Sequence, residues 1–494
     1  MNFFIRVIAL FFCCVLSAQA LAQTEQTYTE FIKDKQHHQG YFSFYLDDKT
    51  GKVFLEITSF EQNFLFQSAL PQGVGSNDIG LDRGQLGDTR LVRFEKVGNK
   101  VFLRQLNTYY RANTSNMLEK QAVDEAFASS IIWGFKVSNH SQDNSKTLID
   151  YTPFLLSDIH NLSAQLKRTK QGDYKIDASR SGVYKKRSKA FPNNTELEAT
   201  VTFKGSKAGT HLRSVTPDAS AVTVNLHHSL IKLPDDGYQT REFHPYSGFW
   251  QHAYADYASA IDEPLIKRNI PRHRLQKKNP EAKISEAVEP IVYYLDAGVP
   301  EPVKSALLDG ARWWDQAFSA IGYKNAFQVK MLPSDADPMD VRYNVIQWVH
   351  RATRGWSYGA SVIDPRTGEI IKGHVTLGSL RVRQDYLIAL GLTSPFKTTE
   401  TDTSKMKAMA LARIRQLSAH EVGHTLGIAH NFAASVNDRA SVMDYPHPLI
   451  TIENDEISLE NAYATDIGIW DKYVVAYGYS DVNKAQEAQY LSEL

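Results

Sequence analysis

The sequence predicts an α+β protein in which an antiparallel, β-rich N-terminal domain precedes a domain of alternating strands and helices. From residue 41 to about 233, short alternating apolar runs are separated by turn residues, which is typical of β-hairpins. Beyond residue 290, longer segments with helical spacing lie between short apolar strands. The chain has 494 residues, of which 43% are hydrophobic and 22% charged, so a disordered or collagen-like class is excluded.

The first 22 residues have the pattern of a secretory signal peptide. Arg6 supplies the positive start, Val7–Leu16 the apolar segment, and Ala20–Ala22 the small-residue cleavage site. We therefore expect residues 1–22 to be removed and the protein to be exported, to the periplasm or the extracellular space. The alternative is a buried N-terminal helix of the mature fold. Both cysteines lie in the apolar segment, so the expected mature chain forms no disulfide.

The apolar segment has about half of the ~20 residues that a membrane-spanning helix needs, so no transmembrane segment is expected in the mature chain. The sequence has 55 basic and 55 acidic side chains and a formal net charge of +0. Because this balance lacks the basic excess of nucleic-acid-binding domains, no nucleic-acid partner is expected. The composition leaves the oligomeric state open.

The N-terminal domain is predicted to span residues 23–268 and to consist mainly of hairpins. This part of the sequence has no compact cluster of metal ligands and no nucleophile motif, and its function is open. We expect His227 and His228 to be surface or packing residues. The predicted strands are Tyr41–Leu46, Lys52–Ile57, Arg90–Lys96, Lys100–Leu106, Ile131–Ser138, Thr147–Leu155, Glu196–Phe203 and Ala221–Leu226.

A basic segment at residues 269–289 is predicted to link the two domains. Basic side chains and two prolines crowd the stretch from Ile266 to Lys283. Such a charge run is usually a solvated connection. The functional alternative is an exposed processing site between the domains.

The second domain is predicted to span residues 290–494, and the last of its predicted elements is a long amphipathic helix. The inward side of that helix carries Ala410, Ile414, Leu417, Glu421 and His424 at helical spacing. The predicted elements are strand Ile291–Leu295, helix Glu301–Ile321, strands Phe327–Leu332 and Asn344–Val349, the hairpin of Ser361–Asp364 with Ile370–Leu377, and helix Lys405–Gly427.

The chemistry-bearing motif is H-E-V-G-H-T-L-G-I-A-H at residues 420–430. Residues four apart share one face of a helix, so His420 and His424 can bind one metal ion. The glycine of the motif can take a positive φ and turn the chain, which brings His430 to the same ion. A catalytic zinc has three protein ligands, for example three imidazoles, and binds water at its fourth position. Glu421 can take a proton from that water. We expect one Zn²⁺ per chain.

A second motif, S-V-M-D-Y-P, follows at residues 441–446. With it, the sequence resembles the metzincin zinc metallopeptidases, which carry H-E-x-x-H-x-x-G-x-x-H and a later Met-turn. The resemblance implies a twisted mixed sheet, an active-site helix, and a hydrophobic floor made by Met443 beneath the three histidines. It also implies that Tyr445 binds the metal or stabilises the oxyanion formed during catalysis.

The stretch from Pro290 to Tyr479 is similar to bacterial secreted zinc-dependent metalloproteases that have an N-terminal domain of unknown function. The similarity rests on V-R-Y-N at residues 341–344, I-Q-W-V-H at residues 346–350 and D-P-R-T-G-E at residues 364–369. Such chains usually continue well beyond the Met-turn, so a C-terminally truncated catalytic domain is one expectation for a sequence that stops at Leu494.

The expected function is therefore hydrolysis of protein or peptide substrates by zinc-activated water, with Glu421 as general base. An extended substrate is expected to pair with an exposed strand edge of the sheet built from residues 344–377. One alternative is a binding or scaffold protein with a structural zinc, which would need a fourth strong ligand and has no Cys for it. Another is a zinc hydrolase acting on a non-peptide amide. The acidic residues Asp335, Asp337 and Asp340 are expected to form a solvated loop rather than a calcium site.

Overall fold

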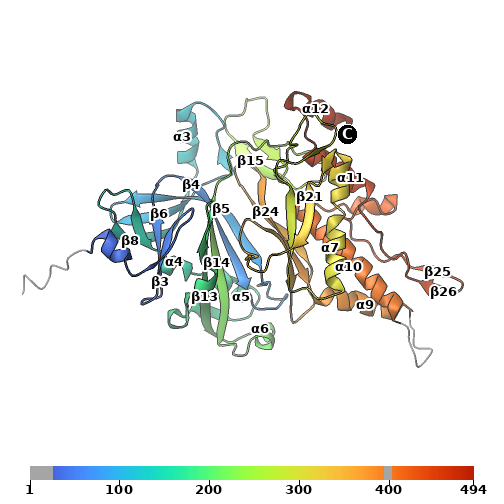
Figure 1. Cartoon of the computed structure of the whole chain (residues 1–494), viewed down its shortest axis with the longest axis horizontal. Coiled ribbons are helices and arrows are strands. Elements are labelled where there is room, and N and C mark those ends of the chain that lie inside the picture. Colours follow the sequence, from blue (N-terminus) through green and yellow to red (C-terminus); the bar gives the residue numbers. More distant parts are fainter. Residues whose placement is uncertain (1–25, 394–402) are drawn as a thin grey trace, which may run out of the picture.

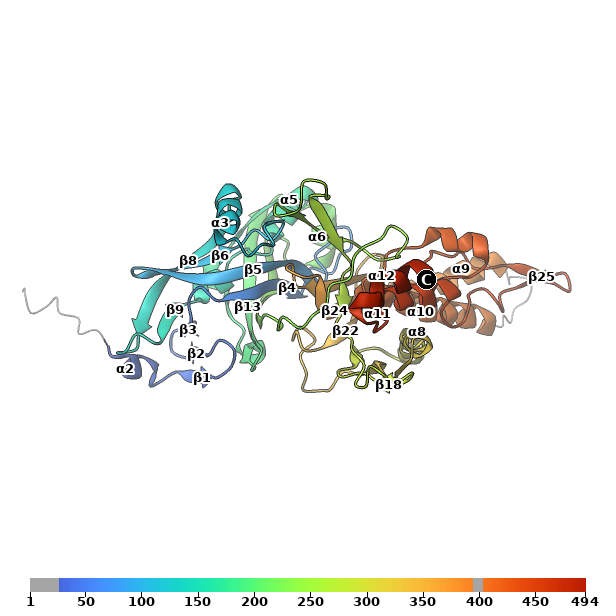
Figure 2. The ribbon, with the colours of Figure 1, turned by 90° about the horizontal axis from the view of Figure 1, so that it is seen from above.

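The computed structural model describes residues 26–393 and 403–494. The predicted signal peptide, residues 1–22, lies outside the described residues. Two parts lie side by side along the long axis, an N-terminal β-sheet structure and a C-terminal sheet with its helices (Figures 1 and 2). The chain is thus a mixed α and β protein with a large antiparallel N-terminal region.

The N-terminal part is built on a 13-stranded antiparallel sheet. Most of its buried apolar side chains form one core, whose last member along the chain is Leu230. In spatial order the strands are β1 (Gln36–His38), β2 (Phe44–Asp47), β3 (Lys52–Ile57), β9 (Thr147–Asp150), β8 (Ser130–His140), β6 (Lys100–Gln105), β5 (Gln85–Val97), β4 (Asn63–Gln72), β14 (Ala221–Lys232), β13 (Asn194–Ser206) and β10 (Asp173–Ile176), with β11 (Gly182–Val183) and β12 (Lys189–Ala190) also pairing with β13.

The predicted strand Thr147–Leu155 is wrong in its second half. Strand β9 ends at Asp150, and residues Thr152–Leu155 form helix α4. The Asp150 side chain accepts a hydrogen bond from the Thr152 amide, and Pro153 lies in the first turn, where a missing N–H costs nothing. The other N-terminal helices are α2 (Tyr28–Ile32), α3 (Met117–Ala126), α5 (Leu162–Arg168) and α6 (Thr210–Val215).

The C-terminal part contains a six-stranded mixed sheet flanked by helices (Figure 1). Strand β23 runs antiparallel to β24, whereas the other pairings in this sheet are parallel. The spatial order is β17 (Arg272–His273), β24 (Glu369–Gly378), β22 (Asn344–Val349), β19 (Ile291–Leu295) and β21 (Phe327–Met331), with β23 (Tyr358–Ile363) beside β24. The helices are α7 (Val303–Arg312), α8 (Asp315–Ala320), α9 (Leu380–Thr393), α10 (Ser404–Thr425), α11 (Ile469–Tyr479) and α12 (Lys484–Glu493).

The predicted helix Glu301–Ile321 is divided into α7 and α8. The division falls at two tryptophans, and Trp314 is fully buried with its Nε1 donating to the Ala419 carbonyl of α10 at 2.8 Å. This anchor joins the first helices of the domain to the helix that carries the zinc motif. Helix α10 begins and ends within two residues of the bounds predicted for it.

The first part of the predicted linker at residues 269–289 is not a solvated connection, whereas most residues from 276 to 289 are exposed. Strand β17 pairs with β24 of the C-terminal sheet, and its two residues are only 6% exposed. Phe249, Ile270 and Leu275 belong to the C-terminal core, so the two cores divide the chain between residues 230 and 249. The basic composition was a poor guide because part of the segment packs into the C-terminal core and the charge of Arg274 is matched by a distant residue, Glu369.

Before it reaches the C-terminal core, the chain forms a small sheet of β16 (Ile266–Asn269), β15 (His252–Asp256) and β7 (Tyr110–Arg111). Two further pairs are β18 (Ser285–Glu286) with β20 (Tyr323–Lys324), and β25 (Thr451–Glu453) with β26 (Glu456–Ser458). None of the helices in the described ranges is both long and apolar enough to cross a bilayer.

The two parts are in direct contact. Arg351 forms a two-pronged ion pair with Asp82 of the N-terminal part, with both distances 2.9 Å and both side chains buried. Val362 of β23 packs with Leu65 and Leu91 from the N-terminal sheet. The N-terminal part therefore supports the C-terminal sheet at β23, the strand that contacts α10.

His227 and His228 are buried packing residues and do not lie on the surface. His227 lies between two buried carboxylates, with Nε2 2.7 Å from Glu196 and Nδ1 3.2 Å from Glu198. These hydrogen bonds raise its pKa to about 10, against the effect of burial.

Of the acidic residues at 335–340, Asp340 is buried and paired with Arg342, so that residue does not belong to a solvated loop.

Candidate metal centre

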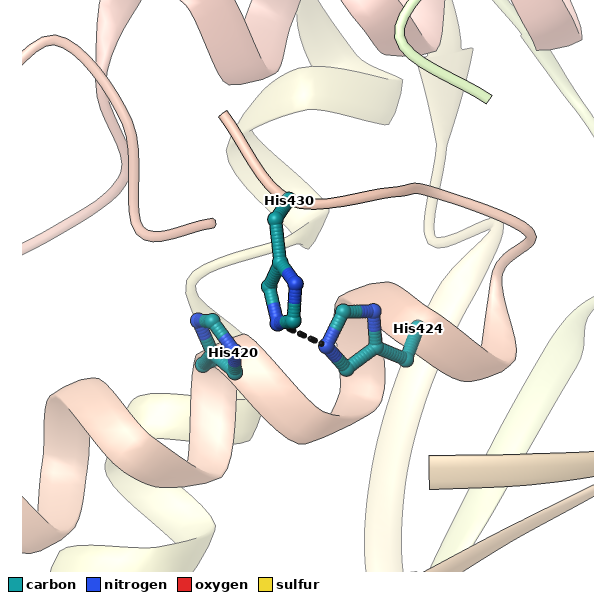
Figure 3. A group of neighbouring side chains, drawn as sticks. All are labelled: His420, His424 and His430. Atoms are coloured by element: carbon teal, nitrogen blue, oxygen red, sulfur yellow. Dashed lines mark hydrogen bonds between the residues drawn. The ribbon is translucent and has the colours of Figure 1, made fainter. Parts of the chain in front are cut away.

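Helix α10 holds the first two histidines of the motif on one face, and the chain then turns back to place the third. Gly427 has φ +96°, and a Cβ there would lie 1.9 Å from the Pro271 carbonyl oxygen. Only glycine satisfies both the positive φ and this close approach. The turn directs His430 toward His420 and His424, and all three side chains converge (Figure 3).

The three imidazoles offer one nitrogen each to a common centre. Their candidate ligand atoms lie within 4.8 Å of one another, and Nε2 of His424 is 3.0 Å from Nε2 of His430. Nδ1 of His420 lies 2.8 Å from the Val442 carbonyl oxygen, and Nδ1 of His424 lies 2.8 Å from that of Ile428. Because a carbonyl oxygen only accepts, these Nδ1 atoms carry the protons and the Nε2 lone pairs face the centre.

Burial keeps these imidazoles in the form that binds metals. It lowers the pKa of His420 to about 3 and that of His424 to about 4, and it also lowers the pKa of His430. All three are therefore neutral at pH 7. Nε2 of His420 is buried without a hydrogen-bond partner, which is costly unless another group binds there. The donor set fits Zn²⁺, which takes neutral imidazole and leaves a fourth position open in catalytic sites.

Glu421, next to the first histidine, is 3% exposed. Burial raises its pKa to about 8, while Arg413 and a hydrogen bond from the Gly359 backbone act in the opposite direction. Gly359 lies on β23, where a Cβ would come within 2.5 Å of the Glu421 carbonyl oxygen. Strand β23 thus passes directly beside the motif.

Met443 lies fully buried beneath the motif. A Cβ on Gly423 of the motif would be 2.3 Å from the Met443 sulfur and 2.7 Å from Trp314 Cζ2. The glycine inside the motif therefore allows the methionine and the tryptophan to approach the backbone of α10. The floor beneath the three histidines that the metzincin resemblance implies for Met443 stays a prediction.

Tyr445 lies beside the histidines and is half exposed. Its ring centroid is 4.9 Å from that of His420 and 4.6 Å from that of His430. Trp250, which the sequence did not point to, is 6.1 Å from the His424 ring, and its amide donates to the Gly427 carbonyl at 2.9 Å. The segment before the predicted linker thus borders the histidine centre.

Asp471 is a buried residue of α11 that the sequence analysis missed. Its carboxylate accepts hydrogen bonds from Ser441 Oγ at 2.7 Å, the Val442 amide at 2.9 Å and the Gly468 amide at 2.7 Å. Burial raises its pKa to about 6 despite these hydrogen bonds. Because the Val442 carbonyl holds His420, Asp471 positions a candidate zinc ligand through one intervening residue. The only local signal was the G-x-x-D spacing of a helix start.

We expect Asp471→Asn to lower the free energy of unfolding by about 1–3 kcal/mol, because an amide would direct N–H groups at backbone donors. The zinc dissociation constant should rise by about tenfold as His420 loses its fixed orientation. Denaturant unfolding and competition with a chelator measure the two effects. Asp466→Asn, at an exposed position of the same segment, is the control and should change neither quantity. Unchanged zinc affinity in Asp471→Asn would refute the positioning role.

Two family models match separate parts of the chain. Residues 402–494 match a family described as Met-zincin, and residues 84–278 match one described as a domain of unknown function (DUF5117). The first match covers the whole motif, the Met-turn and Asp471. No curated protein matches the chain. The Met-zincin match and the converging histidines together support a zinc metallopeptidase of the metzincin type.

Proposed function

We propose that this protein is an endopeptidase that hydrolyses peptide bonds of proteins or peptides with one catalytic Zn²⁺ and Glu421 as general base. The observation that carries the proposal is the convergence of His420, His424 and His430 with a buried carboxylate at the next residue. Burial of a carboxylate is unfavourable, and the raised pKa of Glu421 reflects this. A purely structural zinc site would not need a buried carboxylate at this position.

Zinc held by the three histidines would polarise a carbonyl group and make water acidic enough to ionise near neutral pH. The chain's own contribution is proton transfer. Glu421 accepts a proton from the attacking water and delivers it to the leaving amine. The Gly359 backbone hydrogen bond keeps the carboxylate oriented.

We propose that Tyr445 assists this reaction from the open side of the centre. Its ring lies within 4.9 Å of two histidine rings, and half of the side chain is exposed to an incoming substrate. We propose that its hydroxyl donates a hydrogen bond to the oxyanion that develops on the scissile carbonyl.

We propose that the substrate binds as an extended strand along β23. Strand β23 pairs with β24, and among the strands that the structure describes no other pairs with it. Backbone groups on its outer edge are therefore suited to pair with a peptide, next to Gly359 and the motif. This strand is the edge of the residue 344–377 sheet for which the sequence predicted substrate pairing.

The deciding experiment is cleavage of an unfolded protein with and without a chelator. We expect cleavage at internal peptide bonds, its loss after chelation, and its return when about one equivalent of Zn²⁺ is added. A chelator-insensitive activity would contradict the proposal. Zinc-dependent hydrolysis of small non-peptide amides without cleavage of the protein would instead favour a different hydrolase.

We also propose that the protein is exported, on the basis of the signal-peptide pattern in its first 22 residues. Gln23 is the expected first residue of the protein recovered from the periplasm or the medium. N-terminal sequencing tests this, and recovery of an intact Met1 start in the cell interior would contradict it.

A further inference from the structure

A cavity of about 160 Å³ lies between three segments that are far apart in the sequence, at residues 238–241, 272–276 and 480–487. One water needs about 10–15 Å³ of such space, so the cavity has room for more than a single water. Its lining includes Arg241, Arg272 and Arg274, and Lys484 is exposed at its border. None of the proposed zinc ligands lines it.

Arg272 is a buried cation without a carboxylate partner among the described residues, and its guanidinium carbon lies 5.4 Å from the centre of the Tyr238 ring. The residue is 6% exposed, and its guanidinium makes one hydrogen bond, from Nη2 to the Gln239 carbonyl at 2.7 Å. Its Nε has no partner, and in the described part of the chain no carboxylate lies within ion-pair distance. A guanidinium carries five N–H donors, so most of this group's hydrogen-bonding capacity is unused. Burying a charge in this way is costly unless a counter-charge is bound.

Arg241 adds a second buried cation beside the first. It is 3% exposed and donates to the Tyr477 carbonyl at 2.6 Å, the Ser480 carbonyl at 3.0 Å and Glu487 at 3.1 Å, while its Nε has no partner. Burial lowers its pKa, and the like charge of Arg272 is the second cause. Two buried guanidinium groups therefore repel each other at this wall of the cavity.

The carboxylates around the cavity are largely committed to other groups. Glu487 pairs with Arg241, and Asp481 accepts a hydrogen bond from the Lys277 amide at 2.8 Å. Arg274 is matched by two carboxylates, Asp235 and Glu369. Among the described residues, Arg272 and Lys484 are the lining cations without a carboxylate partner, and Arg272 is the buried one, whereas the carboxylate of Asp481 has no cation partner.

We infer that this cavity binds a compact oxyanion, a phosphate, a sulfate or the carboxylate of a small acid, with Arg272 as its main partner and Lys484 at the entrance. Charge-assisted hydrogen bonds from a guanidinium match such oxygens in geometry and charge. Bound there, the anion would join three segments that are far apart in the sequence and stabilise the folded protein. This inference does not depend on peptidase activity.

The test is a titration of the full chain with sodium phosphate and, separately, with sodium acetate, each against sodium chloride at equal ionic strength. We expect one of the two oxyanions to raise the unfolding temperature saturably, and calorimetry to give its dissociation constant. Binding of phosphate would show that the site takes tetrahedral oxyanions, and binding of acetate that it takes carboxylates. In Arg272→Gln the dissociation constant should rise by about ten- to a hundredfold.

Two further variants keep the test decisive. Lys484→Glu changes an exposed residue, so it should fold normally and still weaken binding, even if Arg272→Gln folds poorly. Arg268→Gln, an exposed arginine on β16, is the matched control and should bind like the wild type. Equal binding by Lys484→Glu and the wild type would overturn the inference, because it would place the anion elsewhere, for example at the histidine centre. A response no larger than that to chloride would overturn it as well.

Discussion

Glu421→Gln is expected to lower kcat/KM for protein cleavage by about 10²–10⁴-fold while the fold and zinc content stay unchanged. The substitution keeps the shape of a side chain that is 3% exposed and removes only its ability to accept a proton. Because burial raises the pKa of Glu421 to about 8, replacing it by a neutral amide relieves a desolvation cost. The free energy of unfolding should therefore not fall.

The measurements are kcat/KM on one protein substrate, zinc by elemental analysis, and denaturant unfolding. Glu460→Gln removes an exposed carboxylate from the same domain and should leave all three values at those of the wild type. If Glu421→Gln cleaves at the wild-type rate, Glu421 is not the general base and the proposed mechanism fails.

Replacing any one of His420, His424 and His430 by Ala should reduce bound zinc from about one per chain to nearly none, and cleavage should disappear with it. Each variant leaves two imidazoles, whereas a catalytic zinc needs three protein ligands. His430→Ala is the most informative of the three, because His430 follows the helix and is only partly buried. Its loss should leave the packing of α10 intact and isolate the effect on the metal.

His140→Ala is the matched control, since His140 is an exposed histidine of the N-terminal part. Zinc content measured after dialysis against a weak chelator distinguishes the variants. Full zinc occupancy in all three ligand variants would show that the metal binds elsewhere or that the assignment is wrong.

Local patterns predicted the bounds of several strands. Strands β3, β19 and β22 have the predicted bounds, because alternation of apolar residues and flanking turn residues are local properties. The prediction failed at Thr147–Leu155 and at the basic segment 269–289. In the first case a helix begins within the run, and in the second Ile270 and Leu275 pack into the C-terminal core and Arg274 is matched by Glu369, which is remote in sequence. Charge alone does not reveal whether a partner exists.

The sequence by itself determined the donor set of the metal centre, because H-E-x-x-H spacing on a helix and a glycine that permits a positive φ dictate where three imidazoles point. Only the tertiary structure decided what surrounds that centre. Asp471 beneath the Met-turn, Trp250 beside His424 and the buried Arg272 come from segments separated by tens to hundreds of residues. Their roles depend on burial and on partners brought together by packing, and neither quantity is encoded in the local spacing of residues.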